Sequence, residues 1–364
     1  MNPGDQYLYQ HYIKSYVIAV VIGFVAMWVV YFVDYTLIAK WAKGIGILVI
    51  AVCALYLSDT IMVRSHVPYY LFIGSCTISI RTLMIIYVPA YGGILYQYRG
   101  GGFMALLKVV IWLCVPVIIA FKLPSLVTAA FLLISMLIQL TVAVWKGWFK
   151  VPIKKTIAVL WSIFTVLPAI LLVLMYHFQL LRSYQIERIR SFLSATGDGF
   201  YITSLLRELK QDAVWIGNSG RDVIGSLPDF NRDYIFAYII SSHGRAMGMV
   251  VVAVLAVFVL FIFSTIVRQK NELGQVMSFG CGMILLLNIV INLLGTLGMI
   301  PLTTTFLPFI SAGASNIYLT YVLLGIVMSV YRYKEVYPRK FKDKSTSAKW
   351  EKLRVYTRDL EETS

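Results

Sequence analysis

The stretch MVVVAVLAVFVLFIFSTI, residues 249–266, holds no charged side chain, and the first charge after it is Arg268. A helix of roughly 20 apolar residues has the length of the roughly 30 Å hydrocarbon core of a lipid bilayer. A helix that is apolar on all sides has no polar face to turn toward water, which is typical of a membrane span. We therefore predict a transmembrane helix here, inside an apolar region that we place at 234–266.

The rest of the chain has the same character. Of its 364 residues, 59% are hydrophobic and 13% are charged, whereas about 25% are charged in a typical soluble domain. Apolar runs of spanning length recur about nine times and lack the alternation of barrel strands, which favours helices. The sequence thus predicts an all-α polytopic integral membrane protein, with spans at 14–33, 43–63, 79–97, 104–122, 124–145, 156–176, 234–266, 273–297 and 306–331.

Lysine and arginine gather in every second connection between these predicted spans. Short cytoplasmic loops are richer in both residues than loops on the opposite side of a membrane. The connections expected in the cytoplasm hold Lys40, Lys43, Arg99, Lys146, Lys150, Lys154, Lys155, Arg268 and Lys270, and the basic tail 332–364 follows the last span.

This orientation places the N-terminus and one long loop, about 177–233, outside the cytoplasm. Because the predicted spans follow one another up to residue 331, residues 1–331 are expected to form one transmembrane domain. Helical spacing of apolar residues at 184–193 and 200–212 predicts two helices that lie on the outer membrane surface. The net charge of +15 follows from the basic loops, which also attract anionic membrane lipids. It gives no reason to expect nucleic acid as a partner.

Acidic residues directly precede the apolar region at 234–266. In the stretch LPDFNRDYIFAYI, residues 227–239, Asp233 stands at the mouth of the predicted helix and Asp229 lies four residues earlier. A carboxylate at this place can take a proton from a substrate hydroxyl, and a second carboxylate nearby raises its basicity. An aspartate there can equally serve as a helix cap. Both interpretations of Asp233 remain open from the residues alone.

Four motifs carry a resemblance to a known family. They are YQIERIRSFL at 184–193, LPDFNRDYIFAYI at 227–239, NLLGTLGMIP at 292–301 and LPFISAGAS at 307–315. In this order they resemble the signatures of the SEDS family, the RodA, FtsW and SpoVE type of membrane proteins.

The resemblance implies a peptidoglycan glycosyltransferase of the bacterial inner membrane that polymerises lipid II, or a related polyprenyl-linked glycan, at the outer membrane face. It also implies a class B penicillin-binding protein, a transpeptidase, as partner. In the family the aspartate of the second motif is the proposed catalytic residue, and here that aspartate is Asp233.

Some positions depart from the family pattern. The His-Thr pair before the aspartate is Asn231-Arg232, and the Glu-Glu pair after it is Ser241-Ser242. Two alternatives to the enzyme therefore stay open. The chain could be an inactive scaffold of a division or elongation complex, or a transporter of lipid-linked precursors; the absence of an evident inverted repeat speaks against the transporter.

Arginine side chains are the candidates for holding a pyrophosphate, because a guanidinium binds phosphate oxygens through two parallel hydrogen bonds. They are Arg188, Arg232 and Arg81. Arg188 could equally reach lipid headgroups from a surface helix. Arg81 lies at the outer mouth of the third predicted span, where a buried charge would be costly. We expect residues 66–80 to form an outer re-entrant segment that keeps the Arg81 guanidinium hydrated. The alternative is that Arg81 has a partner within the protein.

Small and polar residues near the last two spans are weaker candidates. Ser311 and Ser315 are possible substrate ligands, although small residues there more often allow close helix packing. Asn288 and Asn292 share one helix face and are expected to hydrogen-bond neighbouring helices, the second alternative being that they line a cavity. No metal-ligand spacing is present, but a divalent cation near Asp233 would suit a pyrophosphate leaving group.

Overall fold

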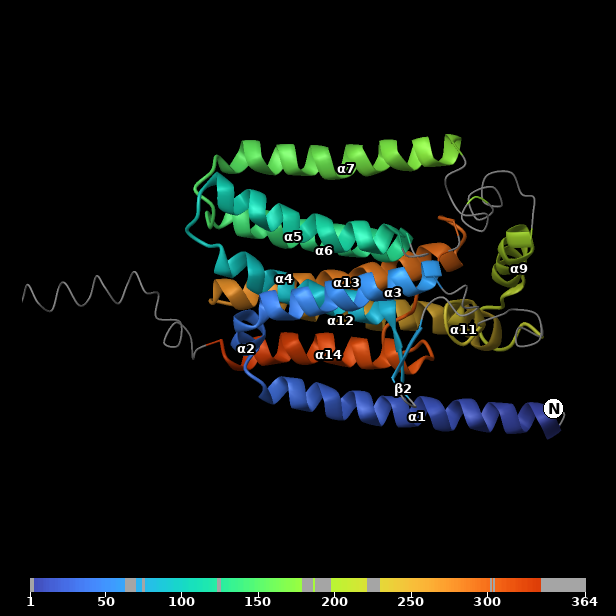
Figure 1. Ribbon diagram of the computed structural model, residues 1–364. Coiled ribbons are helices and arrows are strands. Elements are labelled where there is room, and N and C mark those ends of the chain that lie inside the picture. The colour runs from blue at the N-terminus through green and yellow to red at the C-terminus, as the bar shows by residue number, and fades with distance from the viewer. Residues whose placement is uncertain are drawn as a thin grey trace, which may run out of the picture.

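The computed structural model describes residues 3–62, 70–73, 76–122, 126–178, 186, 198–220, 230–301, 303 and 305–334. Long helices run side by side through the molecule (Figure 1). They are α1 (Pro3–Phe32), α3 (Ala42–Met62), α4 (Ile80–Gln97), α5 (Phe103–Lys122), α6 (Leu126–Trp145), α7 (Ile153–His177), α12 (Arg245–Val267), α13 (Glu272–Thr296) and α14 (Ala314–Arg332). Each predicted span corresponds to one of them, which confirms the polytopic helical membrane class.

Seven helices of the described residues are long and apolar enough to cross a membrane, namely α1, α5, α6, α7, α12, α13 and α14. The described apolar part of α3 is the shorter run Ala42–Leu55. The apolar sequence of α4 is interrupted by Arg81, Pro89 and the pair Gly92–Gly93. We attribute its lower apolarity to its central position, because helix faces that meet other helices need not match lipid.

The predicted span 234–266 is wrong as a single helix. The chain forms α11 (Ile235–His243) and then α12, with a break at Gly244. Gly244 has φ 90°, a region that favours glycine, and a Cβ there would lie 2.6 Å from the carbonyl oxygen of Trp215. The predicted span 306–331 is also too long at its start, because residues 305–313 are irregular and the helix begins at Ala314.

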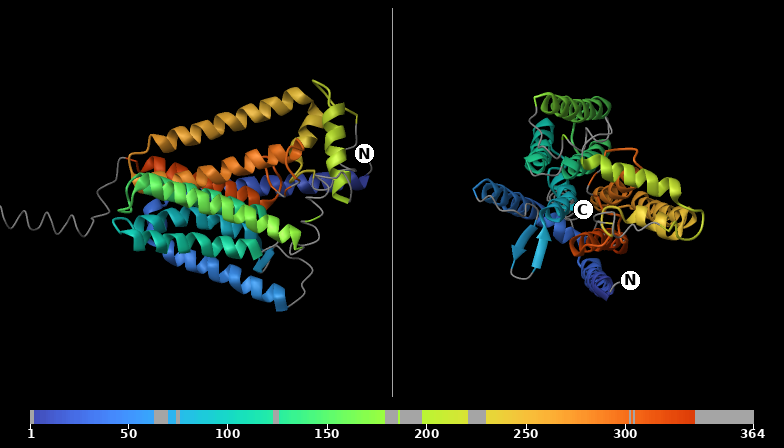
Figure 2. Two further views of the ribbon diagram at one scale, coloured as in Figure 1. Left: turned by 90° about the horizontal axis from the view of Figure 1, so that it is seen from above. Right: turned by 90° about the vertical axis from the view of Figure 1, so that its right-hand side faces the viewer.

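A small β-hairpin lies between α3 and α4, where the sequence predicts a re-entrant segment and no strand. Strand β1 (Tyr70–Ile73) pairs antiparallel with β2 (Cys76–Ser79), so that Tyr70 faces Ser79 and Ile73 faces Cys76. The hairpin projects sideways from the bundle near the start of α4 (Figure 2). The all-α prediction is therefore right for the bundle but omits this element.

Helices α4, α6 and α13 contact one another and form the centre of the bundle. Their facing surfaces bury aromatic and aliphatic side chains such as Tyr91, Leu132 and Ile284. Glycines let the helices approach closely: a Cβ on Gly92 would lie 2.9 Å from Met277 Cγ, and one on Gly93 would lie 2.7 Å from Ala39 Cα. Helix α7 packs on α6 at one edge, and α1 packs on α14 at the opposite edge (Figures 1 and 2).

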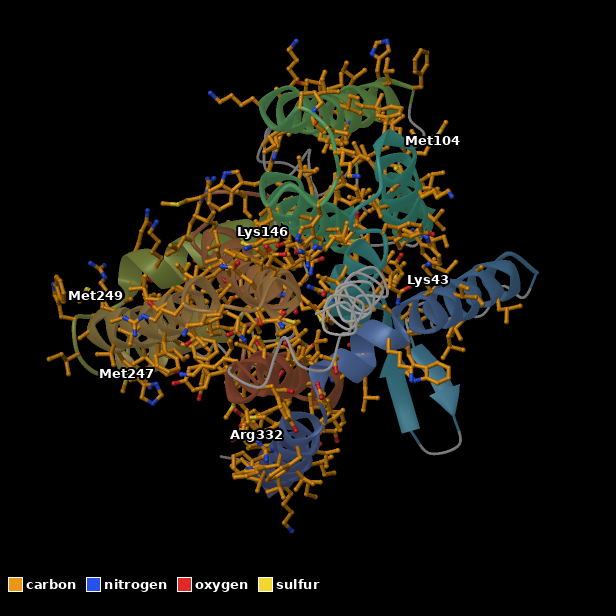
Figure 3. All side chains as sticks on the ribbon, turned by 90° about the vertical axis from the view of Figure 1, so that its left-hand side faces the viewer. Lys43, Met104, Lys146, Met247, Met249 and Arg332 are labelled. Atoms are coloured by element: carbon orange, nitrogen blue, oxygen red, sulfur yellow. The ribbon has the colours of Figure 1, made fainter. Side chains whose placement is uncertain are left out.

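The two ends of the bundle carry different elements. One end, which we call the loop end, carries α9 (Asp198–Asp212), α11 and the irregular residues 213–220. The other, which we call the basic end, carries α2 (Tyr35–Lys40) and is viewed in Figure 3, where Lys43, Lys146 and Arg332 are labelled.

At the basic end the connections between helices are joined by side chains. Arg99 lies 3.3 Å from Glu272 Oε2, and the Trp148 indole N–H donates to the same oxygen at 2.9 Å. These contacts tie together the turns before α5, α7 and α13, which is where the sequence places basic connections.

Candidate functional site

Asp233 lies at the loop end, directly before α11, in irregular backbone that α13 holds in place. The Asn292 amide of α13 is buried and uses both of its N–H groups: Nδ2 donates to the carbonyl oxygen of Asp233 at 2.9 Å and to that of Thr305 at 2.8 Å. Backbone carbonyls outside regular structure need such partners wherever water is excluded. Asn292 thus joins the Asp233 segment, residues 230–234, to the brace, residues 305–313.

Ser311 makes the second connection between these two segments. Its buried hydroxyl donates to the carbonyl oxygen of Arg232 at 2.7 Å and accepts from the backbone N–H of Leu307 at 2.7 Å. The neighbouring N–H of Ala312 donates to the carbonyl oxygen of Asn231 at 2.8 Å. Three consecutive carbonyls, from residue 231 to residue 233, are therefore fixed by α13 and the brace.

The Asp233 side chain is half-buried and interacts electrostatically with Arg81. It does not occupy the N-cap position of α11, because the helix begins at Ile235 with Tyr234 as its N-cap residue, and the Tyr234 side chain makes no cap hydrogen bond. The helix-cap interpretation of Asp233 is therefore not favoured. The carboxylate instead belongs to a pair of opposite charges at the mouth of the bundle.

Arg81 lies in the first turn of α4 and has partners in α13, in α6 and in the brace. Its Nη2 donates to Asn288 Oδ1 of α13 at 3.1 Å, and its guanidinium lies 5.7 Å from the Phe131 ring centroid and 5.6 Å from that of Phe306. Such aromatic faces attract a cation, and the effect grows where water is excluded. Of the two alternatives for Arg81, the structure favours a partnered cation over one kept wet by a re-entrant segment.

A further layer covers the site at the loop end. Helix α9 confirms the amphipathic pattern predicted for 200–212, and its Leu205, Leu206 and Leu209 pack against Ala237 of α11. Residues 213–220 then run along the end of α11: the N–H of Arg245 donates to the Val214 carbonyl oxygen at 2.9 Å. The Ser219 N–H donates to the Ser241 carbonyl oxygen at 2.9 Å, and the two hydroxyls lie 2.7 Å apart.

The remaining predicted site residues have different positions. The side chain of Arg232 is exposed beside Asp233, whereas Ser311 acts inside the protein, on the backbone. Ser315 is half-buried in the first turn of α14. Arg188 and Asp229 lie outside the described residues. Within the part of the chain that the structure describes, no group of three His, Cys, Asp or Glu side chains could hold a metal ion.

Sequence reasoning missed the role of Asn292 in the site. The expected hydrogen bond to a neighbouring helix is confirmed for Asn288, which accepts from Arg81 of α4, whereas Asn292 holds the irregular backbone of Asp233. The signal was present in the spacing, since two amides four residues apart on an apolar helix face the same neighbours.

A membrane-embedded bundle with a carboxylate and a guanidinium paired at one end defines a polytopic membrane protein with a polar site at the membrane boundary. The family model of the cell cycle proteins FtsW, RodA and SpoVE matches residues 4–336, which is nearly the whole chain. The chain belongs to this family.

Individual relatives are distant. The chain is 26% identical over 141 residues to a probable peptidoglycan glycosyltransferase FtsW of Enterococcus hirae, covering 38% of this chain and 36% of that protein. It is 27% identical over 157 residues to the stage V sporulation protein E of Bacillus subtilis, covering 41% of this chain and 43% of that protein. The matched region spans less than half the length of these curated relatives.

Solved structures show the same fold. One is a chain from a peptidoglycan synthase complex that coordinates polymerization and crosslinking, with a TM-score of 0.71, 16% identity and coverage of 89% of this chain and 90% of that chain. Another is the rod shape determining protein RodA of Thermus thermophilus, with a TM-score of 0.61, 14% identity and 88% coverage of each chain.

The hydrogen bonds of Asn292 lead to a first prediction. Asn292→Asp has the same shape but no N–H donor, so the carbonyls of Asp233 and Thr305 lose their partner. We expect the free energy of unfolding to fall by about 1–3 kcal/mol, seen as a lower midpoint of thermal unfolding in detergent. Asn288→Asp is the matched control: it keeps the oxygen that accepts from Arg81 and loses only the Nδ2 bond to the Ile284 carbonyl of its own helix, so its midpoint should fall less. Equal losses in both variants would contradict the role of Asn292.

Proposed function

We propose that this chain is a peptidoglycan glycosyltransferase that polymerises lipid II, a polyprenyl-pyrophosphate-linked disaccharide. The observation that carries the proposal is the electrostatic interaction of the Asp233 carboxylate with the Arg81 guanidinium, in a member of the FtsW, RodA and SpoVE family. Relatives in Enterococcus hirae and Thioalkalivibrio are named as probable glycosyltransferases of this kind, which supports the activity.

In the proposed reaction, a sugar hydroxyl of one lipid-linked unit attacks the anomeric carbon of the glycan on another. The bond from that carbon to the pyrophosphate oxygen breaks, and the hydroxyl proton passes to the Asp233 carboxylate as general base. Asp233 suits this role because it is only half-buried at the mouth of the bundle and its backbone is held rigidly by Asn292. A fixed base avoids the entropic cost of finding its position at each turnover.

Positive charge must steady the pyrophosphate as it leaves. Arg232 offers an exposed guanidinium next to Asp233, on a backbone fixed by Ser311. Arg81 lies deeper, between Asn288 and two aromatic rings, and we assign it to orienting the Asp233 carboxylate. Arg188 stays a predicted ligand of pyrophosphate or headgroups. A divalent cation carried by the pyrophosphate would add to the positive charge.

One observation favours the scaffold as second candidate. Ser241 stands where the family pattern has a glutamate, and its hydroxyl lies 2.7 Å from that of Ser219, in a contact that only joins two parts of the loop end. If that glutamate is needed for turnover, its replacement by a serine with a structural contact would remove the activity and keep the fold. The retained Asp233 and its Arg81 partner favour the enzyme.

A class B penicillin-binding protein is the proposed partner. The structural neighbour from a synthase complex supports it, because that complex combines polymerization with crosslinking. Among the described elements, α6 is the one with which α7 makes substantial contacts. The other faces of α7 carry exposed apolar residues such as Leu167 and Val173. We further propose that the basic end faces the cytoplasm and that the loop end faces outward from the inner membrane.

The catalytic assignment leads to a second prediction. Asp233→Asn keeps the size and polarity of the side chain but removes the proton acceptor. We expect polymer yield from lipid II to fall at least about 100-fold, the usual scale of general-base catalysis. The amount of protein in the membrane should stay near wild type, and the thermal midpoint should fall only slightly, because Asn288 and two aromatic rings still contact Arg81. The assay uses purified protein, with and without the transpeptidase, and labelled glycan separated on gels.

The control for this assay is Asp212→Asn, which removes an exposed carboxylate at the end of α9 on the same side of the bundle. Its polymer yield should match wild type. A wild-type yield from Asp233→Asn at equal protein level would overturn the catalytic assignment. No yield from the wild-type protein, with or without the transpeptidase, would favour the scaffold.

The proposed orientation leads to a third prediction. In a chain without its own cysteines, Ile216→Cys introduces a thiol at a loop-end residue that is 83% exposed, and Lys150→Cys introduces one at the basic end. A membrane-impermeant maleimide added to intact spheroplasts should label residue 216 and spare residue 150, because charged reagents do not cross the bilayer. Labelling of 150 with protection of 216 would reverse the orientation.

A further inference from the structure

Phe309 has an unusual backbone conformation within the brace. Its φ is 65°, and it is the one non-glycine residue with positive φ among the residues that the structure describes. An aromatic side chain in this left-handed region is strained, so the conformation persists only where the surroundings hold it. Observed strain of this kind points to a functional constraint, and here it lies two residues before Ser311.

The strained residue closes a tight turn. The Leu307 carbonyl oxygen accepts from the N–H of Ile310 at 3.1 Å and from that of Ser311 at 2.9 Å. The same turn brings the Ser311 hydroxyl to the Leu307 N–H and to the Arg232 carbonyl oxygen. The backbone angle at Phe309 therefore decides whether Ser311 can reach the segment that carries Asp233.

Three helices hold Phe309 in this conformation. The Phe309 ring makes edge contacts with Phe258 of α12 at 5.1 Å and with Tyr321 of α14 at 5.3 Å between centroids. Its carbonyl oxygen accepts a 2.6 Å hydrogen bond from the hydroxyl of Tyr16 of α1. An oxygen left without a donor at this depth would be costly, so the Tyr16 hydroxyl favours the conformation that points the carbonyl toward it.

Tyr16 reaches the brace from a helix at the edge of the molecule. Helix α1 packs mainly against α14, with Gly23 against Tyr321 and Gly325 against the Met27 backbone, and it lies beside α14 in Figure 1 and in the right view of Figure 2. None of these contacts touches the Asp233 segment. The Tyr16 hydrogen bond is thus a direct link from α1 to the turn that supports Asp233.

We propose that Tyr16 and Phe309 form a latch that positions Asp233 through Ser311. Tyr16 holds the Phe309 carbonyl, the Phe309 conformation presents Ser311, and Ser311 fixes the carbonyl of Arg232, next to Asp233. Neither residue touches the substrate, so both are positioning residues. The effect on turnover rests on the proposed function, whereas the effect on the backbone of the brace does not.

The latch makes a kinetic prediction for Tyr16→Phe, which removes only the hydroxyl. We expect kcat for lipid II polymerisation to fall about ten- to hundredfold, the scale of small misplacements of a catalytic group, with KM unchanged. Tyr31→Phe is the matched control, the same substitution on the same helix, at a ring that packs beside Arg332. A fall in both variants, or a rise in KM alone, would overturn the latch.

The strain itself is tested at Phe309. Phe309→Gly and Phe309→Ala lose the same ring contacts, but glycine adopts positive φ without strain and alanine does not. The glycine variant should therefore have a higher kcat and a higher thermal midpoint than the alanine variant. Tyr16→Phe should cost little further kcat in the Phe309→Gly background, because glycine no longer needs the hydroxyl to hold its conformation. Equal behaviour of the two variants, or fully additive losses, would overturn the proposal.

The thermal measurements separate this proposal from the proposed function. If wild-type protein makes no polymer, the midpoints of Phe309→Gly and Phe309→Ala still decide the latch: a higher midpoint for glycine supports it and an equal midpoint overturns it. If wild-type protein does make polymer and Asp233→Asn does not, the kinetic pattern of Tyr16→Phe decides it in the same way.

Discussion

The site depends on one constraint of the membrane environment, which is that a backbone carbonyl outside a helix must find a donor within the protein. Residues 231–233 form an irregular turn directly before α11, and their three carbonyls receive hydrogen bonds from Asn292, Ser311 and the Ala312 N–H. Without these donors the irregular segment would have no stable place between α13 and the brace. Asp233 owes its fixed position to the backbone bonds, which leave its carboxylate available for chemistry.

Helix α13 sets both halves of the charged pair. Asn288 accepts from Arg81 of α4, and Asn292, four residues later on the same face, holds the Asp233 backbone. An arginine charge inside a helix bundle is expensive unless it has partners, and here the cost is offset by Asn288, two aromatic faces and the Asp233 carboxylate. Because α13 is packed between α4 and α6 at the centre of the bundle, the geometry of the pair follows from the best-buried part of the fold.

The sequence alone predicted the bundle well, because a run such as 249–266 has only one stable environment. It failed at the polar stretch SSHGR, residues 241–245, which the prediction included in one span at 234–266, whereas a positive φ at Gly244 ends the helix there. The place of Asp233 was predicted from its motif, and its partner Arg81 was predicted as a separate candidate. The roles of Asn292, Ser311 and Tyr16 were not, because each acts on the carbonyl of a residue far away in the chain, which no local pattern records.

The central claim is that hydrogen bonds from α13 and the brace hold the Asp233 segment, and residue-resolved hydrogen exchange after Ser311→Ala tests it most directly. The Leu307 N–H loses its acceptor in this variant, and the Ala312 N–H, whose acceptor is the Asn231 carbonyl, loses it only if the segment moves away. The account predicts faster exchange at both amides, with exchange inside α13 unchanged. Faster exchange at Leu307 with wild-type protection at Ala312 would contradict it, because the Asp233 segment would then keep its place without Ser311.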